Sequence, residues 1–569
     1  MRRLALALLI AGCLHAQDAR EEEYRKRAAR LVDHFAGMQS GYPAVTARLA
    51  LQRDAEWASR ELVRLLREPT GDMFWMFPVT AVAHLDRGQL SAEARWALRR
   101  AWKTYMPYRG DTENHWLLYY TCLYLMAQMY PDEPGETWFT GRNSAENRRE
   151  AEAWLRQWMD LTTTIGQGEY DCTHYIGVYV LPLAYLHAWS KDPDMRERAR
   201  KMLDWVIADY AVESLDGLYV GAHARTDDVQ VREKWHGVSS DLGWLWFGQG
   251  HPLPAHSVYT FYHAVAAGYC PPAILHRIAT DRTQPYLHRE QKRTRHRWRF
   301  TGVRNAPVFK TTYMTADYAV GSDQGGILQP IQQHSWDVTW HVADPRGVHN
   351  TMFSLHPYSG VYELQMYFPG MPDFITEAVV RSKRTYDSQD KFLGGSPYEQ
   401  ITQERDTVVA LYNIPPDARF SHINGFFSKD LENVREDPSG WIFAQGGRTY
   451  LAYRPLAAYD WIPIDGGGRR LFSPHRKNGT IVQAAAAGEF ASFEAFCDTV
   501  RKLPLTFRLE PVPAVRFRTL RGAEMDVEYD RTRPESNGML FEGPFLNSAV
   551  GSRKLTITHG GETMVLDLN

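Results

Sequence analysis

Two stretches of sequence decide the fold, because each joins a short polar cluster to a long apolar, aromatic-rich run. Residues 111–129 are DTENHWLLYYTCLYLMAQM, and residues 169–189 are EYDCTHYIGVYVLPLAYLHAW. Asn114 and Tyr175 are 61 residues apart, which is about one helix–turn–helix–turn unit of an all-helical repeat. We therefore expect the two polar clusters at the same end of two neighbouring, similarly directed helices.

The helical pattern extends well beyond these two runs. From residue 20 to about residue 280, apolar residues recur at three- and four-residue spacing, and breakers such as Pro69-Thr70-Gly71 and Gly166–Gly168 fall between the segments. Without a convincing strand, this predicts an α/α toroid, incomplete or closed, over residues 20–285. Helices are expected at 25–38, 45–66, 92–105, 116–130, 146–161, 176–190 and 196–210.

Around Gln291 the pattern changes to that of strands. Residues 295–300 alternate with a period of two, and short β-rich runs follow at 408–412, 441–443, 450–453 and 555–559. Turn signals occur at Asn424-Gly425, Gly446-Gly447, Asn478-Gly479 and Asn537-Gly538. These features predict a large antiparallel β-sandwich over residues 295–569, and so an α+β multidomain protein.

Charge limits the classes of partner. The 569 residues carry a formal net charge of −2, which argues against a general nucleic-acid binder. An acidic polysaccharide or oligosaccharide remains an expected partner if basic groups gather locally. The basic run from Lys292 to Arg299 could steer such a glycan, although a solvated strand face is the more common explanation. The 18 Trp and 30 Tyr residues can stack on sugar faces.

The N-terminus has the pattern of an export signal over residues 1–16. Arg2-Arg3 precedes an apolar run from Leu4 to Ala11, which is too short to span a membrane. Cleavage after Ala16 would release a soluble protein, whereas a lipobox ending in Cys13 would anchor it by a lipid. We expect an exported bacterial protein that is periplasmic, secreted or an outer-membrane lipoprotein.

The two polar clusters suit proton abstraction next to a carboxylate. A base must remove the proton α to the carboxylate, an acid must protonate the leaving oxygen, and an amide or cation must neutralise the carboxylate. Asn114 can bind the carboxylate with help from Arg225, while His and Tyr side chains supply base and acid. Alternatively, Thr112 and its neighbours merely cap a helix, and His115 is an ordinary packing residue.

The sequence resembles a known family at these clusters. Asn114-His115 opening one helix, with Glu169 and Tyr175 opening a later one, is similar to heparinase II/III-like and alginate-type polysaccharide lyases; residues 192–225 also resemble toroid helices of that group. The resemblance implies a toroid followed by a β-sandwich, and β-elimination of a uronic-acid-containing glycan that leaves a 4,5-unsaturated uronate end. It also implies that Asn114 binds the carboxylate, that Tyr175 is acid or base, and that His115 lies nearby.

Alternatives remain for the catalytic set. His174 and Tyr170 also have suitable spacing from the first cluster, and related families bring a His or Tyr from the β-domain, for which His334 is the first candidate. The catalytic candidates are Asn114, His115, His174 and Tyr175. The substrate-binding candidates are Glu113, Trp116, Glu169, Tyr170, Arg225, Trp235, His236 and His334.

No cofactor is expected, because no known metal, phosphate or dinucleotide motif occurs. Some lyases of this architecture carry a structural zinc in the sandwich, for which His334, His341 and His349 are candidates. Two other functions remain open. A glycoside hydrolase would use a pair of carboxylates about 5 to 9.5 Å apart, and a non-catalytic glycan-binding lipoprotein would use aromatic residues such as Trp235. The acids available for hydrolysis are Glu113, Glu169, Asp171 and Asp241.

Overall fold

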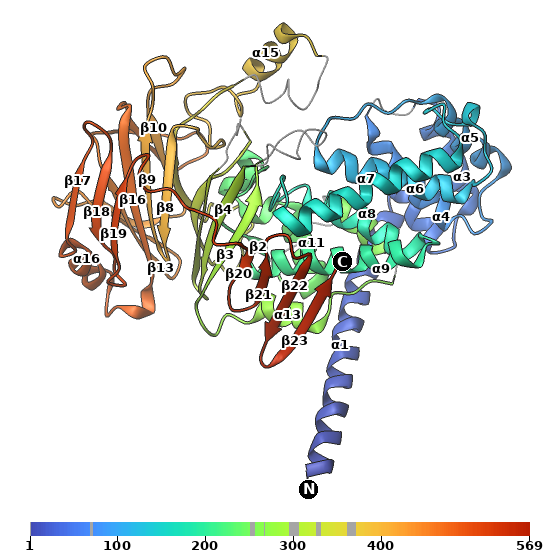
Figure 1. Ribbon diagram of the computed structural model, residues 1–569, viewed down its shortest axis with the longest axis horizontal. Coiled ribbons are helices and arrows are strands. Elements are labelled where there is room, and N and C mark those ends of the chain that lie inside the picture. Colours follow the sequence, from blue (N-terminus) through green and yellow to red (C-terminus); the bar gives the residue numbers. More distant parts are fainter. Residues whose placement is uncertain are drawn as a thin grey trace.

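Helices form the first half of the chain and antiparallel sheets form most of the second (Figure 1), which confirms the predicted α+β class. The computed structural model describes residues 2–68, 72–250, 257–266, 268–294, 306–325, 332–360 and 371–569, with side chains described from residue 19 onward. Among these residues, none of the helices combines the length and apolar character needed to cross a bilayer.

Five helices contact one another in a closed cycle and form the inner ring of the helical domain. The helices α4, α6 and α8 bury nearly every residue, as expected for helices that are apolar all round. The ring consists of α2 (Tyr42–Ala50), α4 (Met76–Leu85), α6 (Glu113–Met129), α8 (Ile176–Trp189) and α12 (Val258–Val265).

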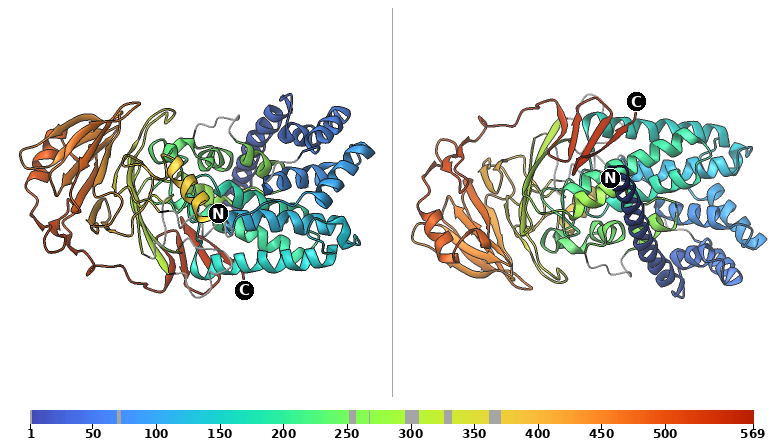
Figure 2. Two further views of the ribbon diagram at one scale, coloured as in Figure 1. Left: turned by 90° about the horizontal axis from the view of Figure 1, so that it is seen from above. Right: turned by 90° about the horizontal axis from the view of Figure 1, so that it is seen from below.

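Longer helices with polar faces pack against this ring, and the views from above and below show the helices lying side by side along their length (Figure 2). The segment expected as one helix over residues 45–66 is two helices, because the chain turns at Gln52 and Asp54, both with a φ of 54°. The remaining helices of this half are α1 (Arg2–Ala36), α3 (Ala55–Leu65), α5 (Ala92–Thr104), α7 (Ser144–Ile165), α9 (Pro193–Val212), α10 (Asp228–Arg232), α11 (Val238–Phe247) and α13 (Ala273–Thr280).

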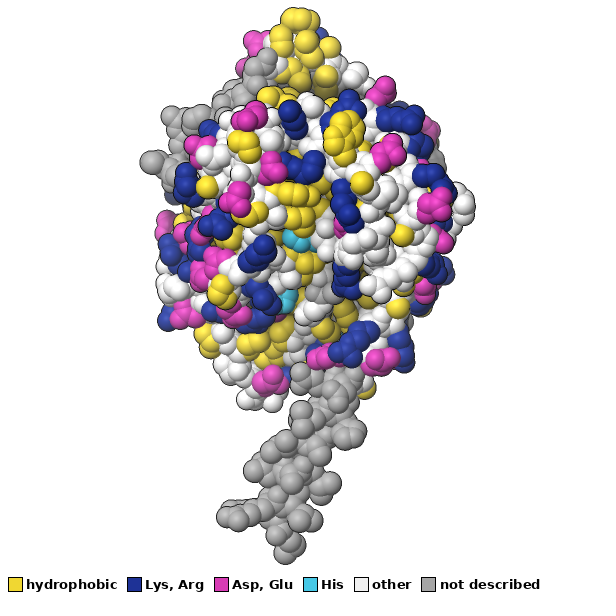
Figure 3. All heavy atoms as spheres, turned by 90° about the vertical axis from the view of Figure 1, so that its right-hand side faces the viewer, with side chains coloured by type: hydrophobic (Ala, Val, Ile, Leu, Met, Phe, Trp, Pro, Cys, Tyr) yellow, Lys and Arg dark blue, Asp and Glu magenta, His cyan; other side chains and the backbone are white. Residues whose placement is uncertain are grey.

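The outer end of the helical domain has a mixed surface (Figure 3). Apolar side chains gather near the middle of this face, and basic and acidic side chains are interspersed around them. This mixture agrees with the near-zero net charge of the sequence.

The β-rich part begins at β3, which follows the helix α13 after a connection of five residues, 281–285. Its main sheet is antiparallel throughout. In spatial order its described strands are β14 (Asp460–Pro463), β15 (Arg469–Ser473), β10 (Ile423–Phe427), β7 (Thr351–Leu355), β6 (Trp336–Trp340), β5 (Tyr318–Gly325), β4 (Pro307–Met314), β3 (Tyr286–Arg293), β20 (Met539–Glu542), β21 (Leu546–Ala549), β22 (Lys554–His559) and β23 (Glu562–Asp567).

A second sheet packs on the first to form a sandwich, with Trp336 and Val338 from one sheet meeting Val408 and Tyr453 from the other. A third, smaller sheet and the helix α16 (Phe493–Arg501) cover its outer face. The second sheet contains β11 (Glu432–Glu436), β12 (Ile442–Gly446), β13 (Thr449–Pro455), β16 (Lys477–Ala486), β9 (Thr407–Asn413) and β8 (Glu399–Glu404); the third contains β17 (Leu505–Arg508), β18 (Ala514–Arg518) and β19 (Glu524–Glu528).

The last four strands leave the sandwich and return to the helical domain (Figure 1). The side chains of Leu540, Phe541, Leu555 and Ile557 belong to the same apolar core as the toroid helices, and β22 and β23 contact α13 and α9. The C-terminal end of the chain therefore completes the core of its N-terminal half.

Two expected turns are strand interiors. Asn424-Gly425 lies within β10 and Asn478-Gly479 within β16, where glycine serves packing instead: a Cβ on Gly425 would lie 2.5 Å from the Tyr453 hydroxyl. The turn expected at Gly446-Gly447 does join β12 to β13. The strand expected at residues 295–300 lies outside the described residues.

Candidate functional site

The two polar clusters meet at the adjoining starts of α6 and α8. Glu169 Oε2 accepts hydrogen bonds from the backbone N–H of Asn114 at 3.0 Å, from its side-chain Nδ2 at 2.7 Å and from the Tyr179 hydroxyl at 3.0 Å. Thr112 occupies the N-cap position but caps no backbone amide, because its hydroxyl accepts from Asn114 Nδ2 instead. The Glu169 carboxylate therefore does the capping expected of Thr112.

Glu113 also links the start of α6 to the loop that leads into α8. Its carboxylate accepts the backbone N–H groups of Gly168 and Glu169 at 2.9 and 2.5 Å, and it forms a buried ion pair with Arg293. Gly168 is required there, because a Cβ would lie 2.7 Å from the Arg293 guanidinium. Lys292 and Arg293, expected on a solvated strand face, are both buried, since each neutralises carboxylates of the helical domain.

Trp116 is also a packing residue in this structure. Its ring is buried, stands edge-on to Trp154 with ring centroids 4.4 Å apart, and carries the Arg109 guanidinium 4.1 Å from its centroid. Trp116, Glu113 and Glu169, all proposed to bind substrate, thus lie beneath the surface and hold the starts of α6 and α8 in place.

Three other candidates come together in a half-buried group. Arg225 Nη2 lies 3.3 Å from the Tyr175 hydroxyl, and its Cζ is 5.0 Å from the Tyr175 ring centroid. The His174 ring stands edge-on to Tyr175 at 5.3 Å. The Arg225 charge acts on both His115 and His174 and lowers the pKa of each. The structure therefore gathers the phenol of Tyr175, the guanidinium of Arg225 and the imidazole of His174, while His115 lies in the first turn of the neighbouring helix α6.

His115 has a defined tautomer. Its Nδ1 accepts a hydrogen bond from the Gly110 backbone N–H at 2.6 Å, so the neutral ring carries its proton on Nε2. Burial lowers the pKa of His115 to about 4, which keeps the ring neutral near pH 7. His115 is consequently a hydrogen-bond donor at Nε2 and is unsuited to act as a base.

His174 differs in its surroundings. Burial is the main cause that lowers its pKa, and Arg225 acts in the same direction, while Asp227 opposes both. Tyr259 packs edge-on against its ring at 5.4 Å. A neutral imidazole keeps one lone pair that can accept a proton. Asp227 and Tyr259 are far from both clusters in sequence, and no local motif marks them.

Tyr170 faces away from this group, into the domain junction. It is buried and donates its hydroxyl proton to Asp323 Oδ2 at 2.7 Å. Burial and the Asp323 charge hold the pKa of Tyr170 well above its usual value. Of the two tyrosines with suitable spacing, Tyr175 is the one that lies beside Arg225.

The backbone of His334 joins the sheet to the helical domain. Its N–H and C=O pair with the C=O and N–H of His223 at 2.9 and 2.8 Å, and Thr226 N donates to Gln332 O at 3.0 Å. The His334 ring is buried and bonds to Asp337 Oδ2 at 2.9 Å. This pairing between the helical domain and the sheet holds the short segment that carries Arg225.

Trp235 and His236 lie on the turn that follows α10. Trp235 packs against the buried Leu215 and Leu218, whereas His236 is exposed and stands edge-on to Trp235 at 5.3 Å. Trp235 is partly buried, so only the exposed part of its ring is available for contact with a sugar.

The three histidines considered for zinc occupy separate places. His341 Nε2 lies 3.4 Å from Asp216, and His349 Nε2 lies 3.2 Å from Glu233, while His334 pairs with Asp337. Among the described residues they do not form a converging set of ligand atoms.

Converging carboxylates occur instead at the domain junction, where two lysines neutralise them. Lys310 Nζ lies 2.7 Å from both Glu213 and Glu290, and Lys292 Nζ lies 3.3 Å from Asp171. Burial, only partly offset by Lys310, raises the pKa of Glu213 to about 8. The sequence did not reveal this network, because its members are separated by long stretches of chain. The two candidate ligand sets are Asp209, His288 and Glu290, and Asp171, Glu213 and Glu290.

The acids considered for hydrolysis are engaged or buried as well. Asp171 accepts from the Tyr219 hydroxyl at 2.6 Å and pairs with both buried lysines. Asp241 is buried in α11.

No protein-family model matches this chain, and no curated protein matches it in sequence.

Proposed function

We propose that this protein is a polysaccharide lyase that cleaves a uronic-acid-containing glycan by β-elimination. The observation that supports the proposal most directly is the 3.3 Å approach of Arg225 Nη2 to the Tyr175 hydroxyl, with the imidazole of His174 beside it. This group supplies a cation for the uronate carboxylate and polar hydrogens for proton transfer.

In this mechanism Arg225 binds the carboxylate and stabilises the negative charge that develops on it when the α-proton leaves. Tyr175 takes the C5 proton and returns a proton to the glycosidic oxygen at C4. The C4–O bond breaks and a C4=C5 double bond forms. His115 donates from Nε2 to an oxygen of the substrate, and His174 is the neighbouring group that can accept a proton.

Asn114 takes a positioning role in this proposal. Its Nδ2 donates to Glu169 and Thr112, so both amide hydrogens are engaged inside the protein. Carboxylate binding, first assigned to Asn114 with Arg225 as assistant, therefore passes chiefly to Arg225. We also propose export of the enzyme, on the pattern of its first 16 residues.

The test is ultraviolet absorbance during incubation with alginate, glucuronan, heparan, chondroitin, hyaluronan and pectin-type polymers. A rise from a 4,5-unsaturated uronate supports elimination and identifies the substrate class. New reducing ends without that absorbance would replace the proposal with hydrolysis. Binding with neither product would favour a glycan-binding protein, for which Trp235 would be the first residue to change.

A further inference from the structure

Lys234 is a buried lysine between the two domains that no step of the proposed mechanism uses. It lies on the short 3₁₀ helix Lys234–His236, and its Nζ is 2.5 Å from Asp337 Oδ2, 3.0 Å from His223 Nε2 and 3.3 Å from Gly221 O. The side chains of Lys234 and Asp337 are both 0% exposed. Since Asp337 belongs to the sheet and His223 to the helical half of the chain, one ammonium group joins the two domains.

Lys234 also fixes the tautomer of His223. An ammonium group can only donate, so His223 Nε2 accepts from Lys234 and the ring proton lies on Nδ1. His223 Nδ1 then donates to the Asp171 backbone carbonyl at 2.7 Å. Burial, and next the Lys234 charge, hold the pKa of His223 well below its usual value, so the ring is neutral near pH 7 and keeps this arrangement.

The same chain of contacts continues into the sheet. Asp337 Oδ2, which pairs with Lys234, also bonds to His334 Nε2 at 2.9 Å, and Asp337 Oδ1 accepts from the Thr339 hydroxyl at 2.9 Å. A carboxylate only accepts, so His334 donates from Nε2. The direction of each hydrogen bond is therefore defined from the Asp171 carbonyl to His334.

Arg225 lies within the segment that carries His223, and the backbone of this segment pairs with residues 332–334 of the sheet. On its other side, the Asp171 carbonyl that accepts from His223 lies four residues before Tyr175. The imidazole thus ties the Arg225 segment to the loop that leads to Tyr175. Without the lysine, the ring nitrogen that accepts from it would be buried without a donor.

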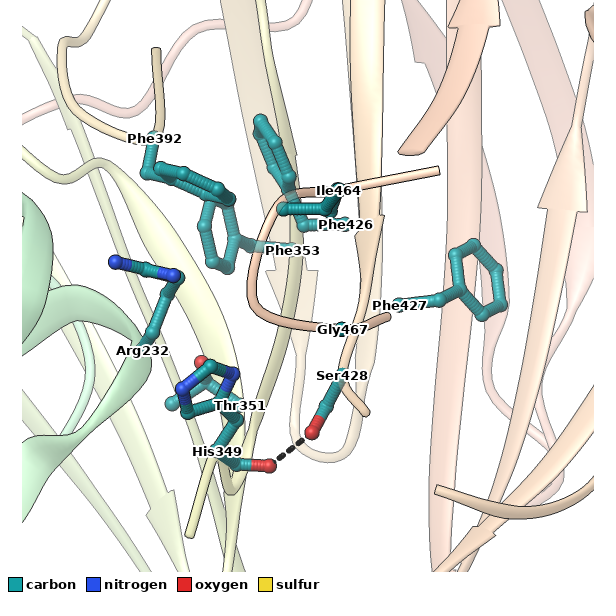
Figure 4. Close-up of a pocket in the computed structure, with 10 residues that line it drawn as sticks. All are labelled: Arg232, His349, Thr351, Phe353, Phe392, Phe426, Phe427, Ser428, Ile464 and Gly467. Atoms are coloured by element: carbon teal, nitrogen blue, oxygen red, sulfur yellow. Dashed lines mark hydrogen bonds between the residues drawn. The ribbon is translucent and has the colours of Figure 1, made fainter. Parts of the chain in front are cut away.

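The element that precedes Lys234 packs closely against the main sheet (Figure 4). Thr351 of β7 donates its hydroxyl proton to Val231 O of α10 at 2.9 Å. Figure 4 shows Arg232 of α10, together with Thr351 and His349, lining the small space that remains, which has room for about one water molecule. Contact with the sheet thus holds the backbone that places Lys234 between the domains.

We propose that Lys234 is a positioning residue that, through His223, sets where Arg225 stands relative to Tyr175. The inference rests on the proposed function, because it concerns the group that binds the carboxylate and the group that exchanges the proton. A misplacement of about 1 Å can lower turnover about 10²-fold. Since the carboxylate gains charge in the transition state, kcat should fall more than KM rises.

The experiment compares Lys234→Met with the double variant Lys234→Met, Asp337→Asn. The single change leaves the Asp337 carboxylate buried without its cation and should destabilise the protein. The double change removes both charges, keeps an acceptor for His334 and should recover much of the stability in urea unfolding, but it restores no donor to His223. In both variants kcat should be about 10–100-fold lower, with KM changed less than about threefold.

A second measurement follows position without turnover. Hydrogen–deuterium exchange at the backbone amides of residues 223–226 should be about tenfold faster in both variants than in the unchanged protein. The matched control is Arg521→Met, which breaks an ion pair with the buried Asp406 in the sandwich. It should lower stability but change neither kcat nor exchange at residues 223–226.

Each other result has a distinct meaning. Unchanged exchange in Lys234→Met, or unchanged kcat in an active enzyme, overturns the inference. Recovery of exchange and kcat together with stability in the double variant also overturns it, because Lys234 would then only neutralise Asp337. If Lys234→Met fails to fold, the double variant carries the test. Failure of the proposed function is detected separately, as faster exchange in a protein that never yields an unsaturated product.

Discussion

Glu169, in the loop that leads into α8, accepts two hydrogen bonds from Asn114 at the start of α6, one from the backbone and one from the side chain. A single carboxylate therefore caps one inner helix and fixes its spacing from the next. Tyr175 and His115 lie at these same helix starts. The hydrogen bonds between Glu169 and Asn114 therefore help to fix the positions of both side chains in the candidate site.

Changing Asn114 to Ala should lower both stability and activity. The variant loses a charge-assisted hydrogen bond to a buried carboxylate, which should reduce the free energy of unfolding by about 1.5–3 kcal/mol. Urea unfolding and turnover of the identified glycan measure the two effects. Lost turnover with unchanged stability would show that Asn114 acts on substrate directly.

Tyr175→Phe should separate chemistry from folding. The ring and its contacts remain, but the hydroxyl that exchanges the proton is gone, so kcat should fall about 10²–10⁴-fold while glycan binding persists. Tyr398→Phe, in the sandwich, is the control. Near-normal turnover in Tyr175→Phe would remove this residue from the mechanism.

Arg225→Gln should reduce kcat/KM about 10²–10³-fold, because charge developing on the carboxylate loses its main cation. Arg225→Lys should recover part of that loss, since it keeps the charge but not the paired hydrogen bonds. Steady-state kinetics on the same polymer give kcat/KM for the unchanged protein, Arg225→Lys and Arg225→Gln, which should decrease in that order. Equal kcat/KM in all three would exclude carboxylate binding by Arg225.

Breaking the buried ion pair of Glu113 and Arg293 should lower the free energy of unfolding far more than breaking an exposed ion pair. Arg293→Met leaves the Glu113 carboxylate buried without its cation and should cost about 3–5 kcal/mol of unfolding free energy. Arg516→Met, which breaks an exposed pair with Asp526, should give no measurable change. The double change Glu113→Gln with Arg293→Met should recover part of the loss in urea unfolding.

Glu213 predicts a pH dependence of stability. Its pKa is about 8 in the folded protein, above the usual 4.5, so the folded state binds the proton more tightly than the unfolded state. This stabilising contribution is full below pH 4.5, declines as pH rises and is lost above pH 8, with a slope of at most about 1.4 kcal/mol per pH unit. Glu213→Gln should flatten urea-unfolding stability between pH 5 and 8; an unchanged slope would contradict this assignment.

The apolar spacing of α6 and α8 was sufficient to predict the helices and their adjoining starts, because burial on all faces leaves a long uninterrupted signal. The same reasoning failed for Lys292 and Arg293, because a run of basic residues is most often a solvated strand face. Their partners, Asp209 and Glu113, lie on helices distant in sequence, and pairwise neutralisation at that range has no local pattern.

The candidate site shows the same limit. Tyr175 and His115 were predicted as candidates from their residue type and their position at helix starts, and Arg225 from its charge. The choice between Tyr170 and Tyr175 depended on which ring faces Asp323 and which faces Arg225, and spacing alone does not determine that direction.

The return of β20–β23 to the helical domain makes the order of synthesis matter. During translation the toroid emerges first, yet Phe541 and Leu555 reach it only when almost the whole chain has been made. Until then the apolar side chains of α9 and α13 that pack against these strands lack those partners. We expect the N-terminal half, expressed alone, to aggregate or bind chaperones, and its final packing to follow that of the sandwich.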